Sequence, residues 1–132
     1  MTYASALGRS PAETYRSIDL AGRTGAADPA GLVDVLYEEG VRALRAAAWA
    51  AENHRPAVKS ERVARATAIL FALEGGLDFD RGGEVARTLA TFYHGLRQQV
   101  VSASVGNNPA PFRAAADDLA EIAGAWATMR AS

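Results

Sequence analysis

The sequence predicts an all-α protein: an antiparallel up-down-up-down four-helix bundle with a short N-terminal helical segment packed against it. Thirty of the 132 residues are alanine, the best helix-forming residue, whereas Val and Ile are too few for long strands. Apolar residues recur at steps of three and four in four stretches of about 20 residues, each ~30 Å long as a helix. Short clusters of Gly, Asn and Pro separate these stretches, and short loops make successive helices antiparallel.

Residues 1–27 are expected to form an N-terminal segment with one short helix, and residues 28–132 to form the bundle. Ser10-Pro11-Ala12-Glu13 opens that helix, because Ser can cap it, Pro suits its first position and Glu completes a capping box. Tyr15 and Ile18 give it a thin apolar edge. Since a helix this short is marginal alone in water, we expect it to dock on the bundle as a cover that a partner can displace.

The first two bundle helices follow from caps, prolines and apolar spacing. Asp28-Pro29 opens a helix expected over residues 29–53, and Asn53-His54-Arg55-Pro56 ends it. Its apolar face consists of Leu32, Val33, Leu36, Tyr37, Val41, Leu44, Ala48 and Ala51. The second helix is expected from near Ser60 to about Gly75. Its heptad-like seam consists of Val63, Ala66, Leu70, Leu73 and Leu77, with Ile69 and Phe71 beside the seam or off it.

The last two helices are bounded by turns that contain glycine. The third is expected over residues 82–105, with Asp80 as its cap. Its seam consists of Val85, Leu89, Phe92, Leu96 and Val100, widened by Tyr93 and Val101. The fourth is expected over residues 109–130, and its apolar face consists of Phe112, Ala116, Leu119, Ile122, Ala123, Trp126 and Met129. The many alanines predict close helix approach and a thin core, which leaves apolar grooves on the surface.

Composition and charge exclude several classes of function. The 14 cations and 15 anions give a formal net charge of −1, so there is no broad basic field for nucleic acid. The chain has no cysteine, which excludes disulfides, thiolate zinc sites and cysteine nucleophiles. The first residues lack the pattern of a signal peptide, and no run approaches the ~20 apolar residues of a membrane span. We therefore expect a cytoplasmic protein without membrane insertion.

Histidine chemistry leaves one alternative open. A di-iron site in a bundle needs Glu-x-x-His on facing helices, and no Glu here is followed three residues later by His. We therefore expect no metal, no cofactor and no enzymatic activity. His94-Gly95-Leu96-Arg97 is similar to the start of the histidine phosphotransfer signature His-x-Leu-Lys-Gly, although Gln98 replaces its glycine. A phosphotransfer-like bundle that uses His94 is therefore kept as an alternative function. A purely structural helical adaptor is kept as a further alternative.

Four stretches, in this order over one short chain, are typical of a known family. They are Tyr15-Arg16-Ser17-Ile18, the Pro-x-x-Leu-x-x-x-Leu-Tyr run of residues 29–37, the Leu-Asp and Gly-Gly-Glu-Val-Ala run of residues 77–86 with Phe92-Tyr93 after it, and Ala125-Trp126. Together they resemble the flagellar secretion chaperone FliS family. The third stretch is the most specific of the four.

The resemblance implies a cytoplasmic export chaperone that carries out no reaction and needs no cofactor. Such a protein binds the disordered C-terminal segment of flagellin, prevents premature polymerisation and delivers flagellin to the flagellar type III export apparatus. The export gate and a co-chaperone or assembly regulator are further candidate partners. The residues expected to contact the partner are Tyr15, Ile18, Leu32, Leu36, Tyr37, Phe71, Leu89 and Tyr93. Core packing is the competing role for those within the bundle.

Overall fold

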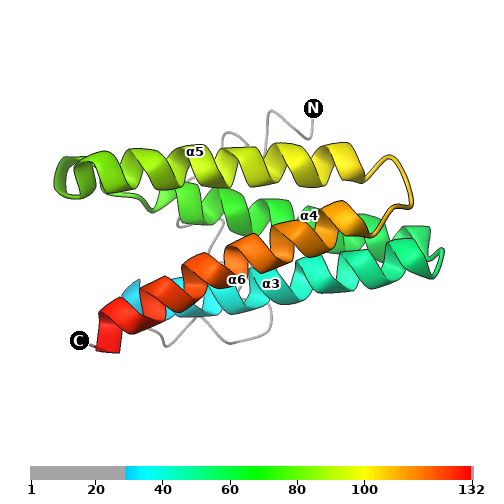
Figure 1. The fold of residues 1–132 in the computed structure, drawn as a ribbon, viewed down its shortest axis with the longest axis horizontal. Helices are drawn as coiled ribbons and strands as arrows, with labels where there is room; N and C mark the ends of the chain where they lie inside the picture. The colour runs from blue at the N-terminus through cyan, green and yellow to red at the C-terminus, as the bar shows by residue number, and fades with distance from the viewer. Residues whose placement is uncertain (1–28, 132) are drawn as a thin grey trace.

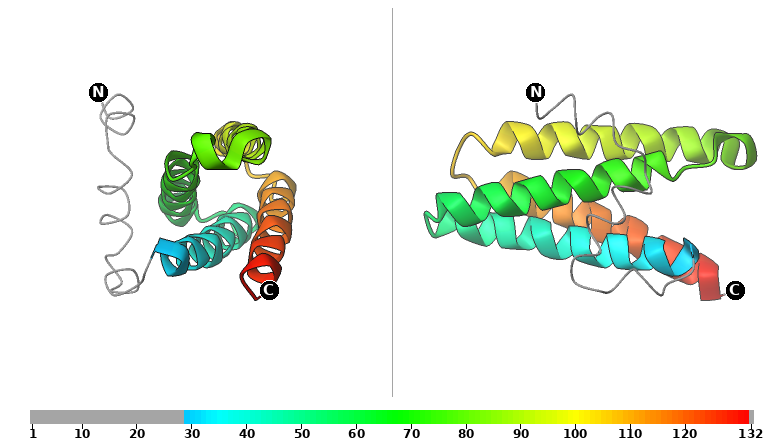
Figure 2. Two further views of the ribbon diagram at one scale, coloured as in Figure 1. Left: turned by 90° about the vertical axis from the view of Figure 1, so that its left-hand side faces the viewer. Right: turned by 180° about the vertical axis from the view of Figure 1, so that it is seen from behind.

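Four α-helices make up the part of the protein that the structure, a computed structural model, describes, which is residues 29–131. They are α3 (Pro29–Glu52), α4 (Pro56–Gly75), α5 (Phe79–Ala103) and α6 (Ala110–Ala131) (Figure 1). Each packs against its neighbours in sequence, and α3 also packs against α6, so the ring of four closes (Figure 2). The predicted antiparallel bundle is confirmed. The short helix expected around Tyr15 and Ile18 lies outside the described residues, so the division at residue 28 stays a prediction.

The connection between α3 and α4 is tighter than the sequence suggested. α4 begins at Pro56 and not near Ser60, because proline suits the first helical position, where no backbone N–H is needed. Within the short turn, His54 takes a positive φ of 54°. One turn into α4, the buried Lys59 donates a hydrogen bond to the carbonyl oxygen of Gly106 at 2.8 Å. This bond ties the start of α4 to the loop between α5 and α6.

The start of α5 contains a break in the helical backbone. Its cap is Asp78, whose side chain accepts a hydrogen bond from the backbone N–H of Arg81 at 3.1 Å. The prediction that Asp80 caps this helix was therefore wrong. Gly83 has φ 51° and ψ −124°, a conformation that favours glycine, and it separates the first turn from the rest of α5.

The apolar face of α5 agrees with the predicted one in part, and it differs most at Val85. Val85 was expected to face the core, but it is 68% exposed. The buried residues are Ala86, Tyr93, Leu96 and Val100, and of these only Ala86 lay outside the predicted face. Val85, Leu89 and Phe92 are spaced by four and three residues, so they share the edge of this buried stripe, where Leu89 and Phe92 are only half-buried. Two other residues expected on apolar faces, Val101 and Met129, are also exposed.

The centre of the bundle is packed through small residues. Ile69, placed beside the predicted seam, is fully buried. A Cβ atom at Gly40 would lie 2.9 Å from Leu119 Cδ2 and 3.1 Å from Ile69 Cγ2, so three helices meet closely at this point. The largest fully buried side chains are Tyr93, Phe112, Leu36, Leu44, Ile69, Leu70, Leu119 and Val100. Close helix approach therefore agrees with the alanine-rich composition.

Candidate functional site

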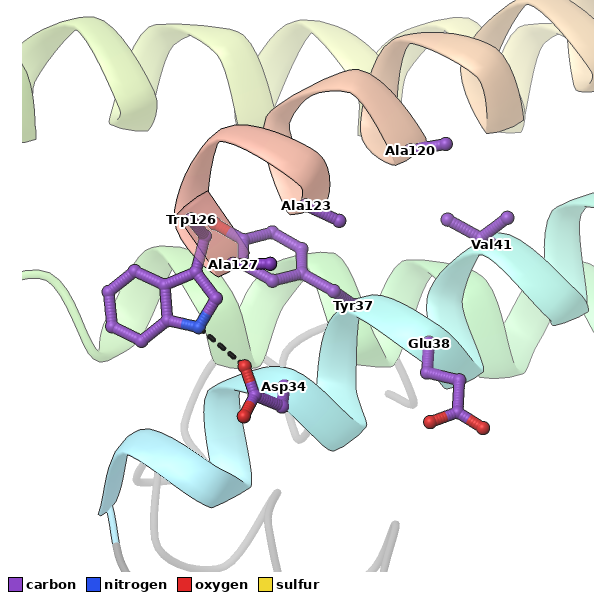
Figure 3. Close-up of a pocket in the computed structure, with 8 residues that line it drawn as sticks. All are labelled: Asp34, Tyr37, Glu38, Val41, Ala120, Ala123, Trp126 and Ala127. Atoms are coloured by element: carbon purple, nitrogen blue, oxygen red, sulfur yellow. Dashed lines mark hydrogen bonds between the residues drawn. The ribbon is translucent and has the colours of Figure 1, made fainter. Parts of the chain in front are cut away.

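An open groove of about 330 Å³ lies between α3 and α6 (Figure 3). Its lining is almost entirely apolar. The α3 side contributes Asp34, Tyr37, Glu38 and Val41, and the α6 side contributes Ala120, Ala123, Trp126 and Ala127. Grooves of this kind between helices are a common place for a protein to bind an apolar ligand or a partner helix.

Helical spacing explains why the groove exists. Asp34, Tyr37 and Val41 are three and four residues apart, so they share one face of α3. Ala120, Ala123 and Ala127 follow the same spacing on α6. Their methyl groups are too short to fill the space opposite the larger α3 side chains. A pair of helices that packs closely elsewhere along its length therefore leaves an unfilled strip here.

Aromatic rings form one end of the groove. The rings of Tyr37 and Trp126 lie 6.5 Å apart between centroids, with an interplanar angle of 56°. Behind the groove, the hydroxyls of Tyr37 and Tyr93 share a buried hydrogen bond of 2.6 Å. Burial raises the pKa of Tyr37 above its ordinary value, and the hydrogen bond with Tyr93 opposes that rise. Tyr37 is therefore anchored in the core by its hydroxyl and presents its ring to the groove.

Asp34 supplies the polar edge of this aromatic end. Its Oδ1 accepts a hydrogen bond from Trp126 Nε1 at 2.6 Å, as Figure 3 shows. Its Oδ2 is paired with the guanidinium of Arg130, which also donates to the carbonyl oxygen of Ala30 at 3.4 Å. One helical turn along α3, the exposed Glu38 is paired with Arg42 at 3.3 Å. The groove thus combines an apolar wall with carboxylates along its α3 edge.

The structure brings few of the sequence-predicted partner contacts together. Tyr37 is the one predicted residue, among those described, that lines the groove. Leu36 and Tyr93 are buried in the core, and Leu32, Phe71 and Leu89 are half-buried elsewhere on the bundle. The ring of Phe71 lies 5.8 Å from the guanidinium carbon of Arg97. Tyr15 and Ile18 lie outside the described residues. The role of these residues in partner binding stays a prediction.

Sequence reasoning did not single out most of the groove. The missed lining residues are Asp34, Glu38, Ala120 and Ala127, while Val41, Ala123 and Trp126 were placed only on apolar helix faces. One signal was available: three alanines at helical spacing beside a tryptophan indicate an incompletely filled helix face. Nothing in the local pattern, however, shows that Asp34 faces Trp126, which is 92 residues later in the chain.

The surroundings of His94 do not resemble a phosphoryl acceptor site. Arg97 donates to His94 Nδ1 at 3.3 Å, but the same guanidinium is paired with Glu74 at 2.7 Å. The cation that would stabilise a phosphoryl group is thus already neutralised by a carboxylate. In residues 29–131 no three His, Asp or Glu side chains are grouped so that they could hold a metal ion. None of the helices in that range is long and apolar enough to cross a membrane.

Comparisons with known proteins all match FliS proteins, and the matches cover nearly the whole chain. The family model described as flagellar protein FliS matches residues 11–132. The chain is 25% identical over 118 residues to the flagellar secretion chaperone FliS of Vibrio cholerae, covering 89% of this chain and 87% of that protein. It is 26% identical over 112 residues to the flagellar secretion chaperone FliSB of Pseudomonas aeruginosa, covering 85% and 89%. The flagellar secretion chaperone FliS of Salmonella typhimurium is 26% identical over 115 residues, with 86% and 85% covered.

Proposed function

The chain belongs to the flagellar secretion chaperone FliS family, and we propose that it binds the disordered C-terminal segment of flagellin in the cytoplasm. In this role it prevents premature polymerisation and delivers flagellin to the flagellar type III export apparatus. The family match over residues 11–132 carries the proposal. The export gate and a co-chaperone or assembly regulator are further partners within it.

The groove between α3 and α6 supports this role physically. A disordered tail that folds into an amphipathic helix can lay its apolar side chains between two bundle helices. The client must lose conformational entropy on ordering, so its affinity depends on how much apolar surface it buries. The apolar wall of Val41, Ala120, Ala123 and Ala127 offers such surface without any rearrangement of the core. Tyr37 and Trp126 add aromatic area at one end.

The N-terminal segment is the proposed cover of the client surface when no client is bound. α3 begins at Pro29, and Asp34 lies five residues later, which is ~7.5 Å along the helix axis. Ile18 lies 11 residues before Pro29 and can reach up to ~36 Å from it. The apolar edge of Tyr15 and Ile18 is therefore within reach of the groove. Deleting residues 1–24 should speed or tighten client binding, and an unchanged rate and affinity would exclude the cover.

A matched pair of substitutions tests the groove. Ala127 and Ala125 are both exposed residues of α6, but only Ala127 lines the groove. Ala127→Trp should fill the groove and weaken binding of a flagellin C-terminal peptide by about tenfold or more, equivalent to the loss of one well-packed contact. Ala125→Trp should bind like the unchanged chain. Isothermal calorimetry gives both affinities, and a negative heat-capacity change on binding is expected from apolar burial.

The two outcomes of that titration separate the function from the site. If the unchanged chain shows no binding to the flagellin peptide, the proposed function is wrong. If it binds but Ala127→Trp and Ala125→Trp behave alike, the function stands and the client lies elsewhere on the bundle. The half-buried Leu32, Phe71 and Leu89 are then the next residues to test.

A further inference from the structure

The carboxylate of Asp34 lies at the aromatic end of the groove, where a charged group of a partner can contact it. Its side chain is 44% exposed, so an incoming group can reach it from solvent. The neighbouring groove walls on α6 are the methyl groups of Ala123 and Ala127, which carry no charge. A client side chain that enters beside Asp34 therefore meets the Asp34 carboxylate, paired with Arg130, and the apolar wall of Ala123 and Ala127.

The two oxygens of Asp34 have partners of different kinds. Trp126 Nε1 donates to Oδ1 at 2.6 Å in a part-buried position, and this bond fixes the orientation of the carboxylate. Arg130 pairs with Oδ2 from the last turn of α6, and its own side chain is 36% exposed. An ion pair between such exposed groups contributes little to stability, because water screens it. Arg130 is thus bound only weakly to the Asp34 carboxylate, whose orientation is fixed by Trp126.

We propose that Asp34 selects clients whose docking helix carries a basic side chain one helical turn from an apolar one, with Arg130 holding the carboxylate until the client arrives. Residues three or four apart share a helix face, so the apolar side chain can enter the groove while the cation reaches Asp34. Arginine suits this site better than lysine, because its planar guanidinium can hydrogen-bond a carboxylate in a bidentate manner. The inference rests on the proposed function and specifies the chemistry of the partner.

Three substitutions test the proposed contact between Asp34 and a basic side chain of the client. Asp34→Asn removes the charge but keeps an oxygen that can accept from Trp126, so the aromatic end of the groove should stay in place. Asp118→Asn removes the same charge from an exposed position of α6 that does not line the groove, and it serves as the control for net charge. Arg130→Gln frees the carboxylate without changing the groove wall.

The test is a double-mutant cycle between the full chain and a synthetic peptide of the flagellin C-terminal segment. Each Arg or Lys of the peptide is replaced by Gln in turn, and affinities are measured by calorimetry at ~50 mM salt, where charges are less screened than at physiological ionic strength. One replacement should weaken binding to the unchanged chain and to Asp118→Asn by about fivefold to tenfold. The same replacement should change binding to Asp34→Asn by less than about twofold. Arg130→Gln should tighten binding of the unchanged peptide by a few fold.

Several results would overturn the inference. If no basic residue of the peptide is coupled to Asp34, or if Asp34→Asn and Asp118→Asn shift affinity equally, the carboxylate does not select the client. Weaker binding by Arg130→Gln would show that Arg130 contacts the client and does not compete with it. Because binding of the unchanged peptide and its loss in Ala127→Trp are measured separately, such failures leave the proposed function intact. An absence of any binding would overturn both.

Discussion

α3 and α5 stand diagonally opposite each other in the bundle, and they pack in different ways (Figure 2). α3 packs extensively against both α4 and α6, whereas the α5–α6 pair packs least of the four neighbouring pairs. The α3 residues at 0–1% exposure are Leu36, Ala43, Leu44, Ala47, Ala48, Ala50 and Ala51. The buried residues of α5 are Ala86, Tyr93, Leu96 and Val100.

This difference follows from side-chain size. The alanines of α3 let two neighbouring helices approach it closely, so even small side chains become fully buried there. α5 has larger apolar residues, yet its buried stripe is narrow, and Leu89 and Phe92 remain half-buried at its edges. The lesson is that burial in this bundle depends on how closely helices approach, more than on the hydrophobicity of any one residue. Stability should therefore be concentrated in α3.

Matched leucine substitutions give the largest expected difference between the two helices. Leu44 of α3 is fully buried, and Leu89 of α5 is half-buried. Leu44→Ala should lower the free energy of unfolding by ~3 kcal/mol, through lost apolar burial and the cavity left behind. Leu89→Ala should cost about half as much, since part of its surface is already in water. Chemical denaturation of both variants measures the difference, and equal losses would contradict the ranking of α3 above α5.

Two glycines should respond to alanine with opposite signs. At Gly40 of α3 the new Cβ would lie 2.9 Å from Leu119 Cδ2, so Gly40→Ala should destabilise the protein by about 1–3 kcal/mol. At Gly95 of α5 nothing lies within 4 Å of the new Cβ. Gly95→Ala should stabilise the protein by ~0.5–1 kcal/mol, because alanine has the higher helix propensity. Thermal denaturation reports both, and a stabilising Gly40→Ala would mean that the three helices can move apart at no cost.

The hydrogen bond between Tyr37 and Tyr93 joins the two diagonal helices through the core, and it gives a pH test. Burial raises the pKa of Tyr37, so the folded chain keeps its proton at pH values where an unfolded tyrosine, with pKa about 10, ionises. The corresponding stability is present below about pH 10 and is lost as the pH rises further, since the unfolded state then binds fewer protons. Urea denaturation at pH 8 and above pH 10 measures the loss.

Tyr37→Phe separates this loss from general alkaline effects. The variant should be ~1 kcal/mol less stable at neutral pH, because the buried hydrogen bond is gone. It should also lose less stability than the unchanged chain as the pH is raised above 10. If both proteins decline in parallel, some other group causes the alkaline loss and Tyr37 is not a buried bridge between α3 and α5.

The helices were predictable from the sequence because their signals are local. Pro29, the glycines near residue 75 and the run at 106–109 each act on their own segment of chain, and the apolar spacing between them is regular. The misassigned features depend on competition between neighbouring signals. Pro56 started α4 ahead of Ser60, and Asp78 capped α5 ahead of Asp80. Each choice was between two acceptable local patterns.

The groove was less predictable because it depends on two helices at once. The residues of α3 that were expected to bind a partner were chosen for apolar character, and that criterion selects core residues such as Leu36 as readily as Tyr37. Asp34 is not apolar, so the same criterion does not select it. Its importance arises only because Trp126 and Arg130 of α6 converge on it, and the sequence does not specify how α6 is rotated against α3.

The smallest expected effect tests the exposed side of α5. Val85 is 68% exposed, whereas Val100 on the same helix is fully buried. Threonine has nearly the shape of valine, so a Val→Thr change reports mainly whether the new hydroxyl is in water. Val85→Thr should change the free energy of unfolding by less than ~0.5 kcal/mol, while Val100→Thr should cost about 1–3 kcal/mol. If chemical denaturation gave Val85→Thr a cost near that of Val100→Thr, the start of α5 would be packed in solution as fully as α3, and the contrast between the helices would disappear.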